Sequence, residues 1–253
     1  MDLQLAGRNA VVLGASRGIG KAIALGLGAE GANVGLCARG AGTLREAEAE
    51  VGSFGVRTFA QACDLADPAA LASFLQAARA ALGSIDILVH NASALALGPD
   101  MASFEASLQL DVLAAARACD QVIPWMIDAG GGSVLLVSSI SGLEASPGAD
   151  LGYATAKGAL ITYAKKLSVY YGPQGIRVNA IAPGSIEFPG GLWAGVREQA
   201  PGQYEAVRAS IPWGRMGTPA EVADLAVYLC SPRAQWVTGA CVPVDGGQHK
   251  GVR

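Results

Sequence analysis

The chain has 253 residues, of which 51% are hydrophobic and 15% are charged, and its formal net charge is −3. This length suits one α/β domain, and the apolar excess suits a sheet that is covered on both faces. Because no basic stripe accompanies the weak negative charge, nucleic-acid binding is excluded as a function class. No stretch reaches the roughly 20 apolar residues that a membrane-spanning helix needs, so no membrane partner is expected.

The N-terminus and the cysteines restrict the class of protein further. Asp2 and an early strand stand where a secretory signal would have a basic start and an apolar middle, so we expect a cytoplasmic protein. The five cysteines are widely spaced and lack a Cys-x-x-Cys pair, and are expected to be small core residues: Cys37, Cys63, Cys119, Cys230 and Cys241. With two distant histidines, His90 and His249, and no acidic cluster, no metal site is expected.

Short apolar runs alternate with segments of helical periodicity. The strands are expected at residues 9–13, 33–38, 56–61, 86–90, 133–138, 176–181 and 240–244. The helices are expected at 18–29, 43–52, 68–82, 101–129, 150–171 and 219–229. This alternation predicts a doubly wound, Rossmann-type α/β fold with a seven-stranded parallel sheet, helices on both faces, and a ligand at the carboxyl ends of the strands. We expect residues 1–253 to form a single dinucleotide-binding and catalytic domain, with the long irregular segment 183–217 as a substrate lid.

A glycine-rich loop separates the first expected strand from the first helix and contains Gly14, Gly18 and Gly20. Missing β-carbons let the chain turn tightly there and bring backbone N–H groups and a helix N-terminus against a pyrophosphate. About 20 residues further on, an acidic residue favours NAD, whereas an arginine accommodates the 2′-phosphate of NADP. The chain has Ala38 and Arg39 there, and Arg17 in the loop adds a second guanidinium. NADP is therefore expected in preference to NAD, with two solvated surface arginines as the alternative.

A proton-transfer pair is expected on the helix at 150–171. Tyr153 and Lys157 are four residues apart, so their side chains share one helix face. A free tyrosine has a pKa of about 10, and a neighbouring ammonium favours its ionised form. Tyr153 can therefore act as the general acid in a reduction, while Ser139 hydrogen-bonds the substrate oxygen. A buried aromatic residue beside a surface lysine is the alternative interpretation.

Together these motifs resemble the short-chain dehydrogenase/reductase family. Further matches extend the resemblance over nearly the whole chain: Ile85-Asp86-Ile87-Leu88-Val89, Val137-Ser138-Ser139, Arg177-Val178-Asn179-Ala180, Pro183-Gly184 and Val244-Asp245-Gly246-Gly247. The resemblance implies an NADP-preferring oxidoreductase of the EC 1.1.1 type that transfers a hydride between the nicotinamide and a neutral ketone or secondary alcohol, with reduction favoured. It also implies that the helices at 101–129 and 150–171 pair across a two-fold axis into a homotetramer or homodimer; packing onto the parent sheet is the alternative.

The resemblance assigns two sets of residues, and the loops that follow strands indicate a third. The catalytic set is Ser139, Tyr153, Lys157 and Asp111. The cofactor set is Gly14, Ser16, Arg17, Gly18, Ile19, Gly20, Arg39, Asp64, Leu65, Asn91, Ala92, Tyr153, Lys157, Pro183, Gly184 and Ile186. The apolar substrate pocket is expected from Leu95, Leu143, Phe188, Pro189 and Trp193, with Trp213 as a further candidate. Ordinary lid packing is the alternative for each pocket residue.

Several positions depart from the family pattern. Leu13 replaces a threonine, and the usual Asn-Asn-Ala-Gly reads His90-Asn91-Ala92-Ser93. Phe188 stands near the place of a threonine that binds the carboxamide, so anchoring of the nicotinamide is altered. His90, which closes an expected strand, is expected to be a hydrogen-bonded core residue.

Asp111 falls where the family has a helix asparagine whose backbone carbonyl binds a relay water. A backbone role would survive this substitution. A carboxylate there could pair with Lys157, reduce the positive charge that acts on Tyr153, and slow the proton relay. The alternative is an exposed helix aspartate one register away.

Two other function classes remain open from the sequence. A nucleotide-sensing regulatory protein would keep the glycine loop but would not need the Ser139, Tyr153 and Lys157 set; the departures at Asp111 and Phe188 favour it. A cofactor-free lyase or dehalogenase on the same fold would have an arginine in place of the lysine and an altered glycine loop, and the chain has neither.

Overall fold

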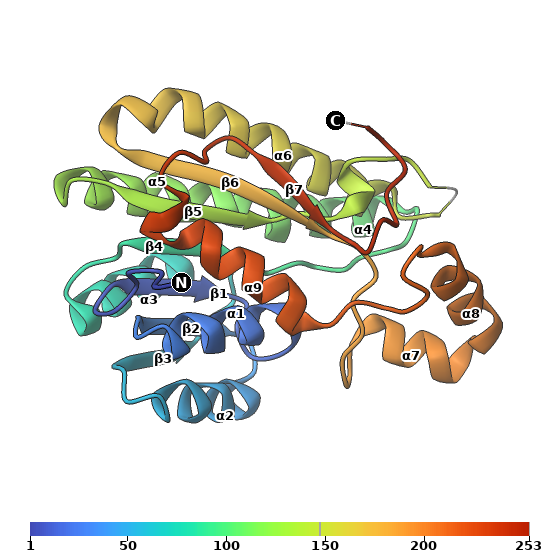
Figure 1. Ribbon diagram of the computed structural model, residues 1–253, viewed down its shortest axis with the longest axis horizontal. Helices are drawn as coiled ribbons and strands as arrows, with labels where there is room; N and C mark the ends of the chain where they lie inside the picture. The colour runs from blue at the N-terminus through green and yellow to red at the C-terminus, as the bar shows by residue number, and fades with distance from the viewer. Residues whose placement is uncertain (147, 253) are drawn as a thin grey trace.

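The computed structural model describes residues 1–146 and 148–252. Its strands form one seven-stranded parallel sheet in the order β3-β2-β1-β4-β5-β6-β7 (Figure 1). The strands are β1 (Asn9–Leu13), β2 (Asn33–Ala38), β3 (Thr58–Ala62), β4 (Ile87–His90), β5 (Gly132–Val137), β6 (Ile176–Pro183) and β7 (Cys241–Val244). The predicted fold is confirmed. Because the strand order reverses between β1 and β4, their carboxyl ends diverge and leave the crevice in which such sheets bind ligands.

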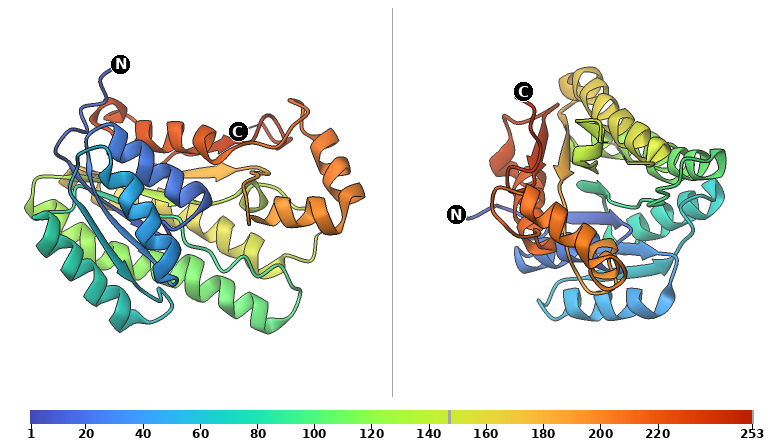
Figure 2. Two further views of the ribbon diagram at one scale, coloured as in Figure 1. Left: turned by 90° about the horizontal axis from the view of Figure 1, so that it is seen from below. Right: turned by 90° about the vertical axis from the view of Figure 1, so that its right-hand side faces the viewer.

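Helices cover both faces of the sheet (Figure 2). One face carries α1 (Gly18–Ala29), α2 (Ala41–Gly52) and α9 (Pro219–Cys230), and the other carries α3 (Pro68–Leu82), α5 (Ala114–Asp128) and α6 (Leu151–Tyr171). Residues of β1 alternate between the two buried clusters: Ala10 and Val12 belong to the first, and Val11 and Leu13 to the second. This double burial explains why the strands are apolar at every position. Short 3₁₀ segments follow three elements: η2 (Ile140–Gly142), η3 (Gly172–Gln174) and η4 (Pro232–Ala234).

The single helix predicted at 101–129 is interrupted. It consists of α4 (Met101–Ser107), a π-helical segment η1 (Leu108–Leu113), and α5. A π-helical turn carries an extra residue and occurs frequently at functional sites. Asp111 lies in this segment and is fully buried. The interruption therefore falls at the position where the sequence departs from the family pattern.

The segment 183–217 is not irregular throughout, so that part of the prediction is wrong. It contains α7 (Leu192–Gln199) and α8 (Pro201–Ser210), a helical pair that projects beside the sheet (Figure 1). The Glu187 carboxylate ties the pair to the end of β6, because it accepts a hydrogen bond from the Tyr204 hydroxyl at 2.7 Å and pairs with Arg197 at 2.6 Å. A role of this pair as a lid stays a prediction. In the described part of the chain, no helix is both long and apolar enough to cross a membrane.

Candidate active site

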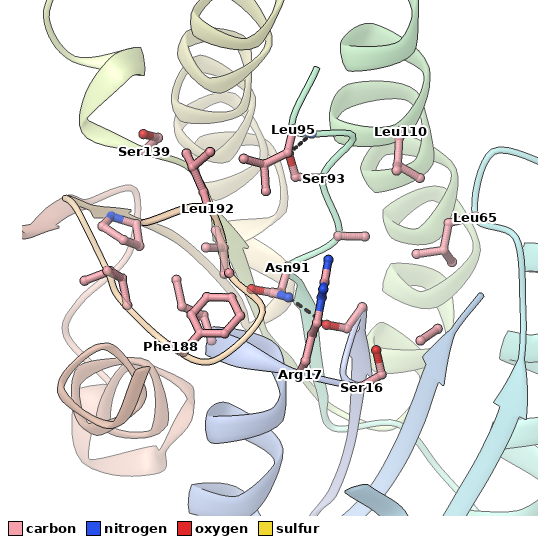
Figure 3. Close-up of a pocket in the computed structure, with 18 of the residues that line it drawn as sticks. Ser16, Arg17, Leu65, Asn91, Ser93, Leu95, Leu110, Ser139, Phe188 and Leu192 are labelled. Atoms are coloured by element: carbon pink, nitrogen blue, oxygen red, sulfur yellow. Dashed lines mark hydrogen bonds between the residues drawn. The ribbon is translucent and has the colours of Figure 1, made fainter. Parts of the chain in front are cut away.

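A cleft of about 510 Å³ lies at the carboxyl ends of the strands, between the glycine loop, the start of α6 and the start of α7. Its size is within the range of small-molecule and cofactor sites. Figure 3 shows Ser16 and Leu65 at one end and Ser139 at the other, with Leu95 and Leu192 on the side of Ser139.

Most of the predicted site residues come together in this cleft. Those that line it are Gly14, Ser16, Arg17, Ile19, Arg39, Leu65, Asn91, Ala92, Leu95, Ser139, Tyr153, Lys157, Pro183, Gly184, Ile186, Phe188 and Trp193. Among the described residues, those predicted for the site that are not part of its lining are Gly18, Gly20, Asp64, Asp111, Leu143, Pro189 and Trp213. Gly18 and Gly20 lie in the first turn of α1, where the glycine loop ends. The Asp64 carboxylate instead accepts a hydrogen bond from the backbone of Ala66 at 3.0 Å.

Steric demands explain the glycines of the loop. Gly14 has φ of +82° and Gly18 has φ of +55°, a backbone region that favours glycine. A β-carbon on Gly14 would lie 2.9 Å from the backbone nitrogen of Ala92, and one on Gly20 would collide with the Gly14 carbonyl and the Asn91 amide. The Asn91 amide donates to the Gly14 carbonyl at 2.7 Å. Asn91 therefore holds the loop against the end of β4.

The glycine loop leads into the N-terminus of α1, where backbone N–H groups are free to bind a ligand. Arg17 is the N-cap residue of α1, and its side chain makes no capping hydrogen bond. The first backbone N–H groups of α1 have no intrahelical partner and are suited to an anion. Arg17 and Arg39 are exposed side chains on the cleft. This donor set, with the tight glycine turn, fits the diphosphate of a nicotinamide dinucleotide.

Phe188 lies beside the glycine loop. A β-carbon on Gly18 would be 2.5 Å from the Phe188 Cζ atom, and one on Gly191 would be 2.9 Å from the same ring. Figure 3 shows the ring near Arg17, well away from Ser139. The side chain thus lines the cleft at its cofactor end instead of beside the catalytic residues. Nearby, the Arg17 guanidinium donates to the Gly190 carbonyl at 3.1 Å and links the loop to the segment before α7.

Ser139 is positioned by close packing between the end of β5 and α6. A β-carbon on Gly142, in η2, would lie 2.6 Å from the carbonyl carbon of Lys157, so η2 packs directly on the backbone of α6. The neighbouring Ser138 hydroxyl donates to the Lys157 carbonyl at 2.7 Å. The Ser139 oxygen accepts from the backbone of Ser141 at 3.1 Å, which leaves its hydroxyl proton available to a substrate oxygen.

Tyr153 and Lys157 lie one turn apart at the start of α6, as predicted. Tyr153 is partly buried, and the Lys157 Nζ atom is 5.4 Å from the centroid of its ring. Lys157 is only 2% exposed, so the alternative of a surface lysine beside a core aromatic residue is wrong. The pair therefore places a phenol and a cation in the same cleft as Ser139.

Lys157 forms a buried ion pair with Asp111. The Lys157 ammonium lies 2.9 Å from Asp111 Oδ1 and donates to the Val137 carbonyl at 3.0 Å. The second carboxylate oxygen, Oδ2, accepts from the backbone N–H of Ala94 at 2.9 Å. Asp111 has an exposure of 0%, so the alternative of an exposed helix aspartate is wrong. Because the pair is formally neutral, Asp111 offsets part of the positive field that Lys157 exerts on its surroundings.

His90 is buried at the end of β4, as expected of a core residue, and lies beside the backbone of Leu110 and Asp111. Within the described residues, neither ring nitrogen makes a hydrogen bond of good geometry, although the backbone groups of Asp111 and Leu110 are close enough to raise its pKa. Burial lowers the pKa of His90 to about 4, and the nearby Lys157 charge acts in the same direction, whereas the Asp111 charge opposes it. His90 is therefore neutral at pH 7.

The neutral state of His90 predicts an acid-dependent loss of stability. Because its pKa is lower in the folded chain than in the unfolded chain, stability is full above the unfolded pKa of 6.5 and falls until pH reaches about 4. At 1.36 kcal/mol per pKa unit, the loss is about 3 kcal/mol. We expect His90→Asn to remove this contribution, as measured by urea unfolding at pH 7 and pH 4.5. If the free energy of unfolding changed by the same amount between pH 7 and pH 4.5 in the wild type and in the variant, that result would argue against a buried neutral imidazole.

The cleft also includes residues that the sequence did not indicate: Gly40, Thr43, Cys63, Ser93, Leu110, Val137, Ser138, Gly191 and Leu192. Four of them come shortly after the end of a strand: Gly40, Cys63, Ser93 and Ser138. Because ligands of this fold bind at the carboxyl ends of the strands, that position could have indicated them. Leu192 begins α7, a helix that was not predicted. Of the cysteines, four are buried as expected, and Cys63 is among them. Among the described residues, no group of three His, Cys, Asp or Glu side chains could hold a metal ion.

Fold and site together define an oxidoreductase of the dinucleotide-binding class. Comparisons with known proteins support the same class. The family model described as enoyl-(acyl carrier protein) reductase matches residues 14–249. Isoepoxydon dehydrogenase of Penicillium expansum is 32% identical over 98% of this chain and 97% of its own length. The chain belongs to the short-chain dehydrogenase/reductase family.

Solved structures extend this similarity to the whole backbone. A structure of 7α-hydroxysteroid dehydrogenase with NADH and 7-oxo glycochenodeoxycholic acid has a TM-score of 0.92 and 30% identity, covering 100% of this chain and 98% of that chain. L-sorbose reductase from Gluconobacter frateurii with NADPH and L-sorbose has a TM-score of 0.90 and 32% identity, covering 100% of both chains. These relatives act on small alcohols or ketones with nicotinamide cofactors, some with NADH and some with NADPH.

Proposed function

We propose that the protein is an NADP-preferring reductase of neutral ketones, with Tyr153 as the general acid. The observation that carries this proposal is the convergence of Tyr153, Lys157 and Ser139 on the cleft that also contains the glycine loop. Bound nicotinamide would supply the hydride. Tyr153 would donate its hydroxyl proton to the ketone oxygen, and the Ser139 hydroxyl would hydrogen-bond the same oxygen as negative charge develops on it. Lys157, held by Asp111 and the Val137 carbonyl, keeps its cation beside the phenol ring.

The preference for NADP rests on the two arginines at the adenosine end. Arg39 follows β2 directly, and the neighbouring Ala38 offers no carboxylate to a free ribose hydroxyl. Arg17, from the glycine loop, also lines the cleft and would have to leave the Gly190 carbonyl to bind the 2′-phosphate. We also infer that Phe188 moves when the cofactor binds, since its ring and a pyrophosphate cannot both lie against Gly18.

The cofactor preference is tested by reversing the charge at one arginine. We expect Arg39→Asp to lower kcat/KM with NADPH by about 10²-fold, because a bidentate charge-assisted contact is replaced by repulsion. Values of kcat/KM with NADH should stay the same or rise. Arg45→Asp makes the same change of charge on α2, outside the cleft lining, and serves as the control. Equal losses in the two variants would show that Arg39 does not contact the 2′-phosphate.

The substrate end of the cleft is apolar. Leu95, Leu192 and Trp193 line the cleft, and Figure 3 shows Leu95 and Leu192 on the side of Ser139. Among the described residues, the arginines that line the cleft are Arg17, in the glycine loop, and Arg39, after β2, so a neutral ketone or secondary alcohol fits the side of Ser139 better than a carboxylate. A panel of ketones and secondary alcohols, followed at the nicotinamide absorbance with NADP and NAD, tests the proposal. Tight NADPH binding without turnover of any compound would instead favour a nucleotide sensor.

We also propose a homotetramer or homodimer. Val169 and Tyr170 of α6 are 67% and 71% exposed, and Leu113 beside α5 is 43% exposed, which is unusual for apolar side chains on two long helices. Pairing of these helices between subunits would bury them. Light scattering at micromolar concentration should give a multiple of the chain mass, and a monomer mass would refute this assembly.

A further inference from the structure

Leu95 has a strained backbone at the substrate end of the cleft. It lies in the loop at residues 91–100, between β4 and α4, and has φ of +48°. For a leucine, this conformation costs on the order of 1–3 kcal/mol. Its side chain is nevertheless 50% exposed and lines the cleft, on the same side as Leu192 in Figure 3. The surrounding structure must therefore hold the loop in place.

Two hydrogen bonds hold this part of the loop. The Leu95 backbone donates to the Ser93 hydroxyl oxygen at 3.1 Å, and the preceding Ala94 backbone donates to Asp111 Oδ2 at 2.9 Å. Ser93 is on the loop itself, whereas Asp111 is fully buried in η1. The carboxylate is thus the anchor that connects the strained loop to the protein interior.

The chemistry at this anchor requires a carboxylate. The Lys157 ammonium forms an ion pair with Asp111 Oδ1, and the Ala94 backbone N–H donates a hydrogen bond to Oδ2, so the two positive or donor groups approach different oxygens of the side chain. An asparagine has one acceptor oxygen, and its NH₂ group would face one of the two donors. The aspartate therefore serves both groups at once. In Asp111→Asn, the Lys157 cation attracts the single amide oxygen, and the NH₂ group then faces the Ala94 N–H, which loses its acceptor.

We propose that Asp111 is a positioning residue for substrate selectivity, which couples Lys157 to the Ala94 backbone and thereby fixes Leu95 as a wall that limits the size of the ketone. This inference rests on the proposed ketone reduction. When the anchor is lost, the loop relaxes from its strained conformation and Leu95 withdraws from the cleft. Bulkier ketones then gain access.

The test compares Asp111→Asn, Leu95→Ala and the double variant with the wild type, using one small and one bulky cyclic ketone. Removing part of a pocket wall is worth about 10-fold in selectivity. We expect Leu95→Ala to raise the ratio of kcat/KM for the bulky ketone over the small ketone by about that factor. Asp111→Asn should raise the same ratio, and the double variant should exceed neither single variant, because both act through one wall. Met101→Ala is the control, because Met101 begins α4 directly after the loop, is 67% exposed and is not part of the cleft lining.

Amide hydrogen exchange of the peptide that contains Ala94 provides a readout that needs no turnover. The Ala94 amide should exchange slowly in the wild type and at least about tenfold faster in Asp111→Asn, as expected when a protecting hydrogen bond to a buried group is lost. The inference would be overturned if Asp111→Asn lowered kcat/KM for both ketones equally, so that their ratio stayed constant. An unchanged exchange rate of the Ala94 amide would overturn it as well. A wild-type protein that reduces no ketone would refute the proposed function, while the exchange measurement alone still supports or refutes the anchor.

Discussion

Replacing Tyr153 by phenylalanine is expected to lower kcat/KM for ketone reduction by about 10³-fold, within the range that a general acid contributes. The substitution removes only the hydroxyl, and the ring remains 5.4 Å from the Lys157 ammonium in the wild-type geometry. Stability and NADPH binding should therefore change little. The measurement is initial rates with saturating NADPH, together with a binding titration of the nucleotide.

Tyr170→Phe is the matched control for this prediction. Tyr170 is on the same helix, α6, but is 71% exposed and contacts the Tyr171 ring instead of the cleft. Removal of its hydroxyl should leave the rate unchanged. Activity that persists in Tyr153→Phe at the wild-type level would mean that another group supplies the proton.

Replacing Lys157 by methionine is expected to affect both stability and activity. The change leaves the Asp111 carboxylate buried, and among the described residues the Ala94 N–H is then its one hydrogen-bond donor. Removing one member of a buried ion pair costs about 3–5 kcal/mol. The cation beside Tyr153 is also lost, so kcat/KM should fall by at least about 10²-fold. The free energy of unfolding from urea titration and the initial rates measure the two effects.

A double variant separates these two roles. Lys157→Met with Asp111→Asn removes both charges and keeps an acceptor for the Ala94 N–H. We expect it to recover most of the unfolding free energy, because no unpaired charge stays buried. It should not recover activity. A single Lys157→Met variant that is as stable as the wild type would contradict the ion pair that the structure shows.

The sheet and the catalytic pair could be predicted from the sequence because their signals are local. Apolar strands alternate with helical segments, and the spacing between Tyr153 and Lys157 alone puts both on one helix face. The position of Asp111 in the family pattern also indicated its pairing with Lys157. That pair is present in the structure.

Other features depend on three-dimensional packing. The π-helical turn η1 adds one residue to a turn without changing the helical appearance of the sequence around Asp111. The short helices α7 and α8 would be marginal in isolation, and tertiary contacts such as those of Glu187 hold them. The buried imidazole of His90 and the strained backbone of Leu95 follow from how β4 and its loop pack against η1. No local pattern encodes them.

The most direct test of the central claim is a crystal structure of the protein with NADPH and a ketone that it reduces. We expect the ketone oxygen to lie within about 3 Å of both the Tyr153 hydroxyl and the Ser139 hydroxyl. The nicotinamide ring should lie alongside, on the Lys157 side of the cleft. A Tyr153 hydroxyl that points away from the ketone, or a nucleotide bound outside the glycine loop, would contradict the central claim.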